Sequence, residues 1–436
     1  MLTSIESRNS LAVESRIGFV FASAPGWALF FSLLFVPTVY KPAKYVLIAL
    51  VFVVIGANMA VSGRIRLHPT VLAWTYMFVS VGAAFVLLGL ANNASGALRL
   101  APLYVAWPIA YMVFVEGAAE PRVLESLQAV LVVAAFVIFS YALMYISMQA
   151  GLLPSFPLPE FDLDPHIGFY PGFMQYSLNN LASMLFLVPY LMALVVIRPT
   201  GRSRAGEILL WSALILGIAA VGLSLRRGIM VAVALGPLFI AVLAAFLPRA
   251  ERGRAARSLA TLVAALVVLV SGAVLYAHFR YGWTPDNLLA FISGGYDFQS
   301  PVDPGAVARS LQFNALIDAW VRSPIFGAGA GASGAAYVRD PAQPWAYELS
   351  YVALLYQTGV LGLALYASGI AWIFWTGSRM IRSGHPLGLR LFPVLIGLAA
   401  FLVGNATNPY LAKFDYLWVI FLPVAYINLW LLRSRP

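Results

Sequence analysis

Long apolar runs, separated by short polar segments, follow one another along almost the whole chain. A helix that crosses a bilayer needs about 20 mostly apolar residues. The predicted spans are residues 17–40, 43–62, 70–91, 98–116, 122–150, 176–197, 206–225, 228–247, 257–278, 348–376, 388–406 and 413–432. Only Arg226 and Arg227 divide the seventh span from the eighth. The pattern predicts an all-α integral membrane protein with about 12 transmembrane helices.

The polar segments between the spans are short except at two places. Residues 151–175 form the smaller long loop, and residues 279–347 form a larger one before the tenth predicted helix. Within the larger loop the segment Ala306–Val321 has helical spacing. Ala308, Leu311, Ala315, Leu316 and Trp320 can share one face of this helix. We expect one membrane domain over residues 1–436, with 279–347 as an external cap.

Composition supports the membrane assignment and excludes other classes of protein. Hydrophobic residues make up 61% and charged residues only 10%, whereas soluble domains carry about 25% charged residues. A soluble enzyme and a disordered chain are therefore excluded. Since the chain has no cysteine, it is neither a disulfide scaffold nor a carrier of a cysteine-based metal or redox site.

The positive charges predict the orientation in the membrane. The net charge of +10 reflects 27 Lys and Arg against only 17 Asp and Glu, and we do not read it as a nucleic-acid signal. If the N-terminus is cytoplasmic, 17 of the 27 cations fall in cytoplasmic segments, as the positive-inside rule requires. The N-terminal segment shows no signal-peptide cleavage pattern, so its helix is expected to be retained. Both termini are then cytoplasmic, and both long loops face outward.

Arginines on the expected outer side are candidates for chemistry, because charges near a membrane are costly. Arg226 and Arg227 either reach lipid phosphates by snorkelling or clamp a phosphate-containing substrate with their guanidinium groups. Arg309 pairs with an aspartate of the cap, either Asp303 or Asp318, or serves the same clamp.

Two further charged residues of the outer side, Arg280 and Glu348, are candidates for the site. Arg280 lies just past a span, where it is either interfacial or catalytic. Glu348 opens an apolar span, so it either complements the helix dipole or acts as a general base. Arg322 and Arg339 look like ordinary loop charges. The histidines show no metal-ligand spacing, and there is no phosphate-loop motif.

Four segments in order carry a resemblance to a known family. They are HIGFYPGFMQYSLNNLASML (166–185), SLRRGIMVAV (224–233), ARSLQFNALIDAWVRSPIFGAGAGAS (308–333) and YELSYVALLYQTGVLGL (347–363). Together they resemble the O-antigen ligase and Wzy-type polysaccharide polymerase superfamily, with Gly168, Asn180 and Ala182 at similar places in the first segment. The resemblance covers roughly residues 166–365.

The resemblance implies a GT-C-type glycosyltransferase in the bacterial inner membrane, with its active site facing the periplasm. The implied donor is an undecaprenyl-diphosphate-linked oligosaccharide, and the acceptor is a sugar hydroxyl of a glycan or of lipid A core. No cofactor or metal is implied. Flippase and chain-length regulator proteins are implied partners besides the lipid bilayer; nucleic acid is not.

The family pattern carries over onto particular residues of this chain. The implied catalytic residues are Glu348 as base and Arg309, Arg227 and Arg226 at the diphosphate, where fixed positive charge would stabilise the leaving group. The implied substrate-binding residues are Arg280, Asn180, His166, Tyr347 and Tyr351. Direct attack opposite the diphosphate would invert the anomeric centre.

Three alternatives to the polymerase stay open at the level of sequence. Ligases of the superfamily typically carry a histidine where this chain has Glu348, which favours a polymerase over a ligase. Tyr347, Tyr351 and His166 are the substitute bases if Glu348 is not the base. A flippase or transporter of lipid-linked oligosaccharides is the alternative from another class, although we detect no related halves. A structural membrane protein without activity is the third.

Overall fold

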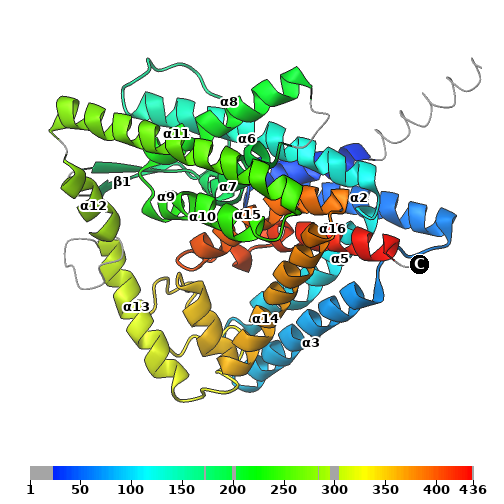
Figure 1. Ribbon diagram of the computed structural model, residues 1–436. Coiled ribbons are helices and arrows are strands. Elements are labelled where there is room, and N and C mark those ends of the chain that lie inside the picture. The colour runs from blue at the N-terminus through cyan, green and yellow to red at the C-terminus, as the bar shows by residue number, and fades with distance from the viewer. Residues whose placement is uncertain (1–22, 171–172, 199–202, 283, 295–303, 435–436) are drawn as a thin grey trace, which may run out of the picture.

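The chain folds as a multi-pass helical membrane protein. The computed structural model describes residues 23–170, 173–198, 203–282, 284–294 and 304–434, and 76% of it is helix (Figure 1). In this part of the chain, ten helices or helical runs are long and apolar enough to span a membrane. They are α2 (Lys41–Ser62), α3 (Pro69–Ala91), α4–η1–α5 (Ala97–Gly117), α6 (Pro121–Gln149), η2–α7 (Asn179–Ile197), α8 (Arg204–Ser224), α9–α10 (Arg227–Ala244), α11 (Arg249–Tyr281), α14 (Ser350–Arg382) and α15 (Pro386–Asn405).

The first and last predicted spans each hold an apolar helix that is short within the described residues. The helix Ser23–Phe35 and α16 (Trp418–Arg433) are apolar but have fewer than 18 residues within the described chain. The predicted start of the first span, residues 17–22, lies outside the described residues. The prediction of about 12 spans is therefore supported at ten places, and the other two hold short apolar helices.

A backbone turn separates the seventh and eighth predicted spans. Helix α8 ends at Ser224, and Leu225 then adopts the left-handed conformation with φ 52°. Arg226 is extended, with φ −84° and ψ 99°, before α9 (Arg227–Ala234) begins. Because such a turn cannot continue a helix, the two spans are distinct, as predicted.

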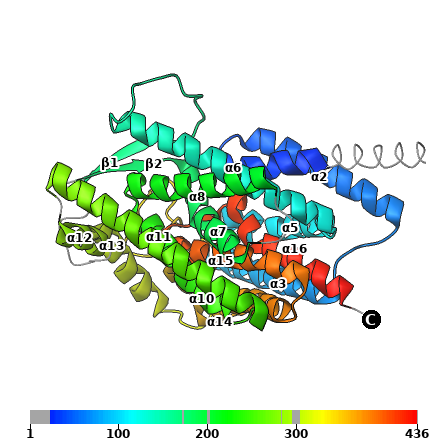
Figure 2. The ribbon, with the colours of Figure 1, turned by 45° about the horizontal axis from the view of Figure 1, so that its top comes forward.

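The buried centre of the molecule is α7 (Met184–Ile197), every residue of which is buried. Figure 2 shows α8, α11 and α15 around it, and all three contact it. Glycines let α15 approach: a Cβ at Gly397 would lie 2.8 Å from the ring of Phe186, and one at Gly404 would lie 2.6 Å from Leu185. Small residues at helix contacts are typical of membrane interiors, where close packing replaces the hydrophobic effect.

In its described residues, the segment between α11 and α14 contains two helices, α12 (Pro285–Gly294) and α13 (Pro304–Trp320). Helix α13 confirms the helical spacing of Ala306–Val321, but the apolar residues that share its predicted face are not all buried. Leu311 is 51% exposed, whereas the neighbouring Gln312 is only 2% exposed. Apolar spacing misplaces the face because it assigns every polar residue to solvent.

A small β-hairpin departs from the predicted all-α fold. Strands β1 (His166–Tyr170) and β2 (Phe173–Ser177) pair antiparallel, with Ile167 opposite Tyr176. The hairpin lies in the smaller long loop. It also displaces the start of the sixth span from residue 176 to Asn179, since the residues up to Ser177 are paired in the strand.

The glycine-rich segment after α13 runs between α3 and α14. Gly359, with φ 63°, kinks α14 and leaves the carbonyl groups of the preceding turn free. Two of these accept hydrogen bonds from the glycine-rich segment, Tyr356 O from Ala328 N and Gln357 O from Gly329 N, both at 2.9 Å. On its other side Ala330 N donates to Phe85 O of α3 at 2.8 Å. This segment therefore joins α3 and α14 by backbone hydrogen bonds.

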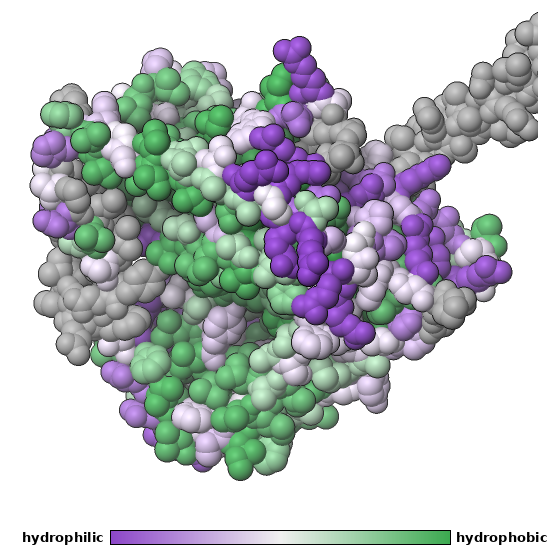
Figure 3. All heavy atoms as spheres, in the orientation of Figure 1, coloured by the Kyte–Doolittle hydropathy of each residue, from purple (hydrophilic) through white to green (hydrophobic). Residues whose placement is uncertain are grey.

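The helix ends gather at two opposite ends of the molecule. The cap end holds the hairpin, α12, α13 and the start of α14 (Figure 1). The arginine-rich end holds the last turn of α2, the first turns of α6, α11 and α15, and the last turns of α14 and α16. There the Arg390 guanidinium pairs with Glu125, and Asn428 bonds Arg66 O and His68 N. Figure 3 shows hydrophilic residues concentrated toward that side of the view and apolar residues over the middle.

Candidate functional site

The candidate base Glu348 lies between two guanidinium groups at the cap end. Its Oε2 is 3.7 Å from Nε of Arg309 on α13, and its Oε1 pairs with the guanidinium group of Arg339. The side chains of Glu348 and Arg309 are only 19% and 24% exposed. The Nε of Arg309 is buried and has no hydrogen-bond partner among the described residues. This N–H group is therefore held near the carboxylate by charge and not by a hydrogen bond.

Gln312 fixes the backbone that carries Glu348. Its buried Oε1 accepts from the backbone N–H groups of Glu348 and Leu349, both at 2.9 Å. Gln312 lies one turn after Arg309 on α13, so one helix face holds both the backbone and the carboxylate of Glu348. Glu348 itself precedes α14, whose N-cap is Leu349. The expectation that it sits in the first helical turn is therefore wrong.

The tyrosines proposed as substitute bases are engaged in structural contacts. The hydroxyl of Tyr347 donates to Ala332 O at 3.4 Å, and its side chain is buried. Burial raises the pKa of Tyr347 well above its usual value, so the phenol stays protonated and is a poor base. The hydroxyl of Tyr351 donates to Leu402 O at 2.7 Å and ties α14 to α15.

The arginine pair at the start of α9 lies at the same end but contacts other residues. The Nη1 of Arg226 donates to Ser177 Oγ of the hairpin at 3.1 Å. Arg227 opens α9. The segment 406–417 lies near this pair, because the Cβ position of Gly228 is 3.9 Å from Thr407 Oγ1. The described contacts of Arg226 thus run to the hairpin, whereas those of Arg309 run to Glu348.

Three other predicted substrate-binding residues are placed differently. Asn180 is fully buried in η2, and neither end of its amide has a hydrogen-bond partner among the described residues. His166 begins β1, and Arg280 lies near the end of α11. The structure describes the backbone of His166 and Arg280 but not their side chains.

Two site residues, Arg339 and Gln312, were not predicted from the sequence. The prediction that Arg339 is an ordinary loop charge is wrong, since it pairs with Glu348. Gln312 gave no signal, because a lone glutamine in a helix usually faces water. The predicted ion pair between Arg309 and Asp318 is not found among the described residues. Arg309 pairs with Glu348 instead. Asp303 lies outside the described residues.

The arrangement combines a carboxylate with two guanidinium groups. Guanidinium groups bind phosphate oxygens with directed hydrogen bonds, and a positioned carboxylate can accept a proton. In Figure 3 the surface is hollowed between the helices α9–α11 and the helices α13 and α14, and apolar residues predominate around it. A polar reacting group with an apolar tail would suit such surroundings.

Fold and site together define a polytopic α-helical membrane protein with a charged site among the helix ends of one side. Comparison of the sequence with known protein families and with curated proteins gives no match. A function for this chain must therefore be inferred from its own residues.

Proposed function

We propose that this chain is a membrane glycosyltransferase that builds a cell-envelope polysaccharide. The proposed donor is a glycan on undecaprenyl diphosphate, and the proposed acceptor is a sugar hydroxyl of a second glycan. The proposal places the cap end in the periplasm and the arginine-rich end in the cytoplasm. The observation that carries it is the carboxylate of Glu348 held between Arg309 and Arg339, with one N–H of Arg309 left without an acceptor in the described structure.

The pairing of Glu348 suggests how donor binding would prepare the site. A diphosphate carries more negative charge than a carboxylate and offers more oxygens to guanidinium groups. When it binds Arg309 and Arg339, it competes with Glu348 for both cations. The carboxylate is then released toward the acceptor, while the arginines stay on the leaving group.

The reaction follows from this exchange. Glu348 takes the proton of the acceptor hydroxyl as its oxygen attacks the anomeric carbon of the donor sugar. The bond between that carbon and the diphosphate oxygen breaks, and its electron pair goes to the lipid diphosphate. The arginines stabilise the charge that develops on this leaving group. Attack from the face opposite the leaving group inverts the anomeric centre.

A polymerase is preferred to a ligase because Glu348 stands where ligases of the superfamily typically have histidine. In the alternative, the same chemistry attaches the glycan to lipid A core. We propose that Arg226 and Arg227, near the hairpin, bind another part of the substrates, either a phosphate group or a glycan. A flippase, by contrast, would move the lipid-linked glycan across the membrane without making or breaking a bond.

The test is a reaction of purified protein with its undecaprenyl-diphosphate repeat unit, read as a glycan ladder on a gel. Arg309→Ala and Glu348→Gln are expected to abolish the ladder, each with a loss of at least about 100-fold in rate. Arg322→Ala is the matched control, because it removes the same charge from the same segment without touching Glu348.

Each outcome assigns the chain to one class. A ladder that is lost in Arg309→Ala and Glu348→Gln but kept in the Arg322→Ala control supports the polymerase. Product only after addition of lipid A core supports the ligase. Absence of turnover with either acceptor overturns the enzyme and favours transport of the lipid-linked glycan.

A further inference from the structure

A second site lies away from Glu348, toward the arginine-rich end. It is a cavity of about 580 Å³ between the helix Ser23–Phe35, α2, α5, α6 and α16. Its walls are mostly aliphatic and aromatic side chains. This volume is within the range of small-molecule sites, roughly 300–1,000 Å³.

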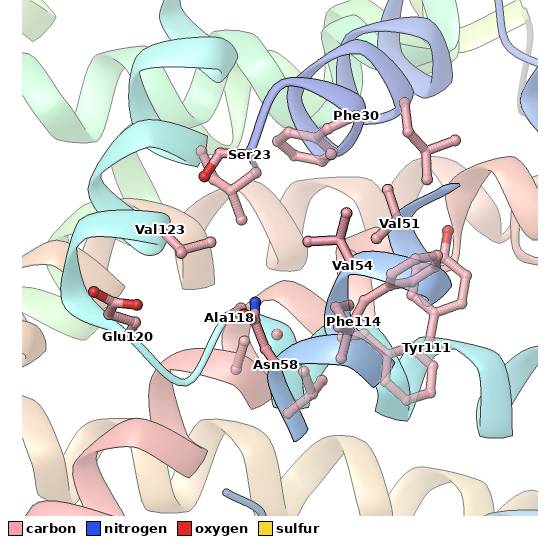
Figure 4. Close-up of a pocket in the computed structure, with 18 of the residues that line it drawn as sticks. Ser23, Phe30, Val51, Val54, Asn58, Tyr111, Phe114, Ala118, Glu120 and Val123 are labelled. Atoms are coloured by element: carbon pink, nitrogen blue, oxygen red, sulfur yellow. The ribbon is translucent and has the colours of Figure 1, made fainter. Parts of the chain in front are cut away.

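The charged residues that line this cavity are Glu120, Arg64 and Arg66. Figure 4 shows Ser23, Val123 and Glu120 on one side, Phe30, Val51, Val54, Phe114 and Tyr111 on the other, and Asn58 between them. The arginines Arg64 and Arg66, just beyond the last turn of α2, also line it. The cavity is therefore amphipathic, as a lipid is.

The length of the cavity matches one leaflet of a bilayer. Along α2 its lining runs from Val51 to Ser62, which is about 16 Å at 1.5 Å per residue. The hydrocarbon core of a bilayer is about 30 Å thick, so half of it is about 15 Å. One hydrocarbon chain lying along the helix would have its head group beside Arg64.

The charges at the polar end select the head group. Arg66 is already paired with the buried carboxylate of Glu116, at 3.1 Å from its Nε. Arg64 and Glu120 show no ion pair among the described residues, and both line the cavity. One free cation and one free anion complement a head group that carries both charges: Arg64 suits a phosphate, and Glu120 suits an ammonium group.

We propose that this cavity binds one zwitterionic phospholipid of the surrounding leaflet, with an acyl chain in the cavity. Its phosphate lies at Arg64, and its ammonium group lies at Glu120. The site is independent of the proposed glycosyl transfer, since it is formed by different helices and lies toward the opposite end. Such a lipid would brace α2 against α6 and α16.

Native mass spectrometry of the detergent-purified full chain tests the proposal. The protein is delipidated, incubated with phosphatidylethanolamine, and scored for the fraction that retains one lipid. Val54→Trp fills the cavity and is expected to abolish retention. Val53→Trp is the matched control, because Val53 is 69% exposed and does not line the cavity.

Head-group recognition is tested separately. Arg64→Gln and Glu120→Gln are each expected to weaken binding about tenfold, the effect of one charge-assisted hydrogen bond. Arg122→Gln, which removes an exposed charge of α6 that does not line the cavity, is expected to have no effect. Equal retention by Val54→Trp and Val53→Trp overturns the site. Equal binding of a lipid without the ammonium group overturns the head-group assignment.

Discussion

Replacing Gly329 by alanine should destabilise the protein strongly, although it adds only one methyl group. Gly329 has φ 93°, a conformation that costs other residues about 1–2 kcal/mol. A Cβ there would also lie 2.3 Å from the backbone N of Gly89 and 2.4 Å from its Cα. These are backbone atoms of α3, so they cannot rotate away. Overpacking of this kind costs about 1–3 kcal/mol, and the expected total is about 2–5 kcal/mol.

The assay is thermal unfolding of the purified protein in detergent, followed by tryptophan fluorescence. Gly222→Ala in α8 is the control, because its Cβ would meet nothing within 4 Å and alanine is favoured in a helix by about 1 kcal/mol. Gly329→Ala should lower the midpoint by several degrees, and Gly222→Ala should keep or raise it. Equal midpoints for the two variants would refute a structural role for the glycine-rich segment.

Three further predictions concern polar residues. Gln312→Leu leaves two buried N–H groups unpaired near Glu348, so turnover should fall about tenfold with little change in KM; a change confined to KM would contradict this positioning role. Lys44→Met should cost about 3–5 kcal/mol of stability by stranding buried Asp415, and the double variant with Asp415→Leu should recover most of it in the same unfolding assay. Tyr347→Phe should leave the pH–rate profile unchanged, because the raised pKa keeps the phenol protonated throughout the working range; a shifted alkaline limb would identify it as a base.

The helical spans were predictable because each depends only on local composition. A bilayer demands about 20 apolar residues in every crossing, and α2, α3, α6 and α15 satisfy this within a few residues of the predicted bounds. Even the break after Ser224 was predictable, since two adjacent arginines would be costly in the middle of a span.

Contacts between distant segments were not predictable from the sequence. Arg309 and Glu348 were both candidates, but nothing in their spacing says that Arg339, in the loop between them, shares the same carboxylate. The role of Gln312 depends on two backbone groups 36 and 37 residues away. The hairpin was missed because two strands of five residues give too short an alternation to compete with a neighbouring apolar span.

The buried ion pair of Lys44 and Asp415 is relevant to the separation between Arg226 and Arg309. The Nζ of Lys44 donates to Asp415 Oδ1 at 2.5 Å and to Val36 O at 2.7 Å, and both charged side chains are about 98% buried or more. Such a pair adds little net stability. It does, however, fix the segment 406–417, which passes near Arg226, against the start of α2. If Arg226 and Arg309 hold different parts of the substrates, as proposed, their separation depends on this segment. We therefore expect the Lys44/Asp415 double variant to lose a larger fraction of its turnover than of its folded protein.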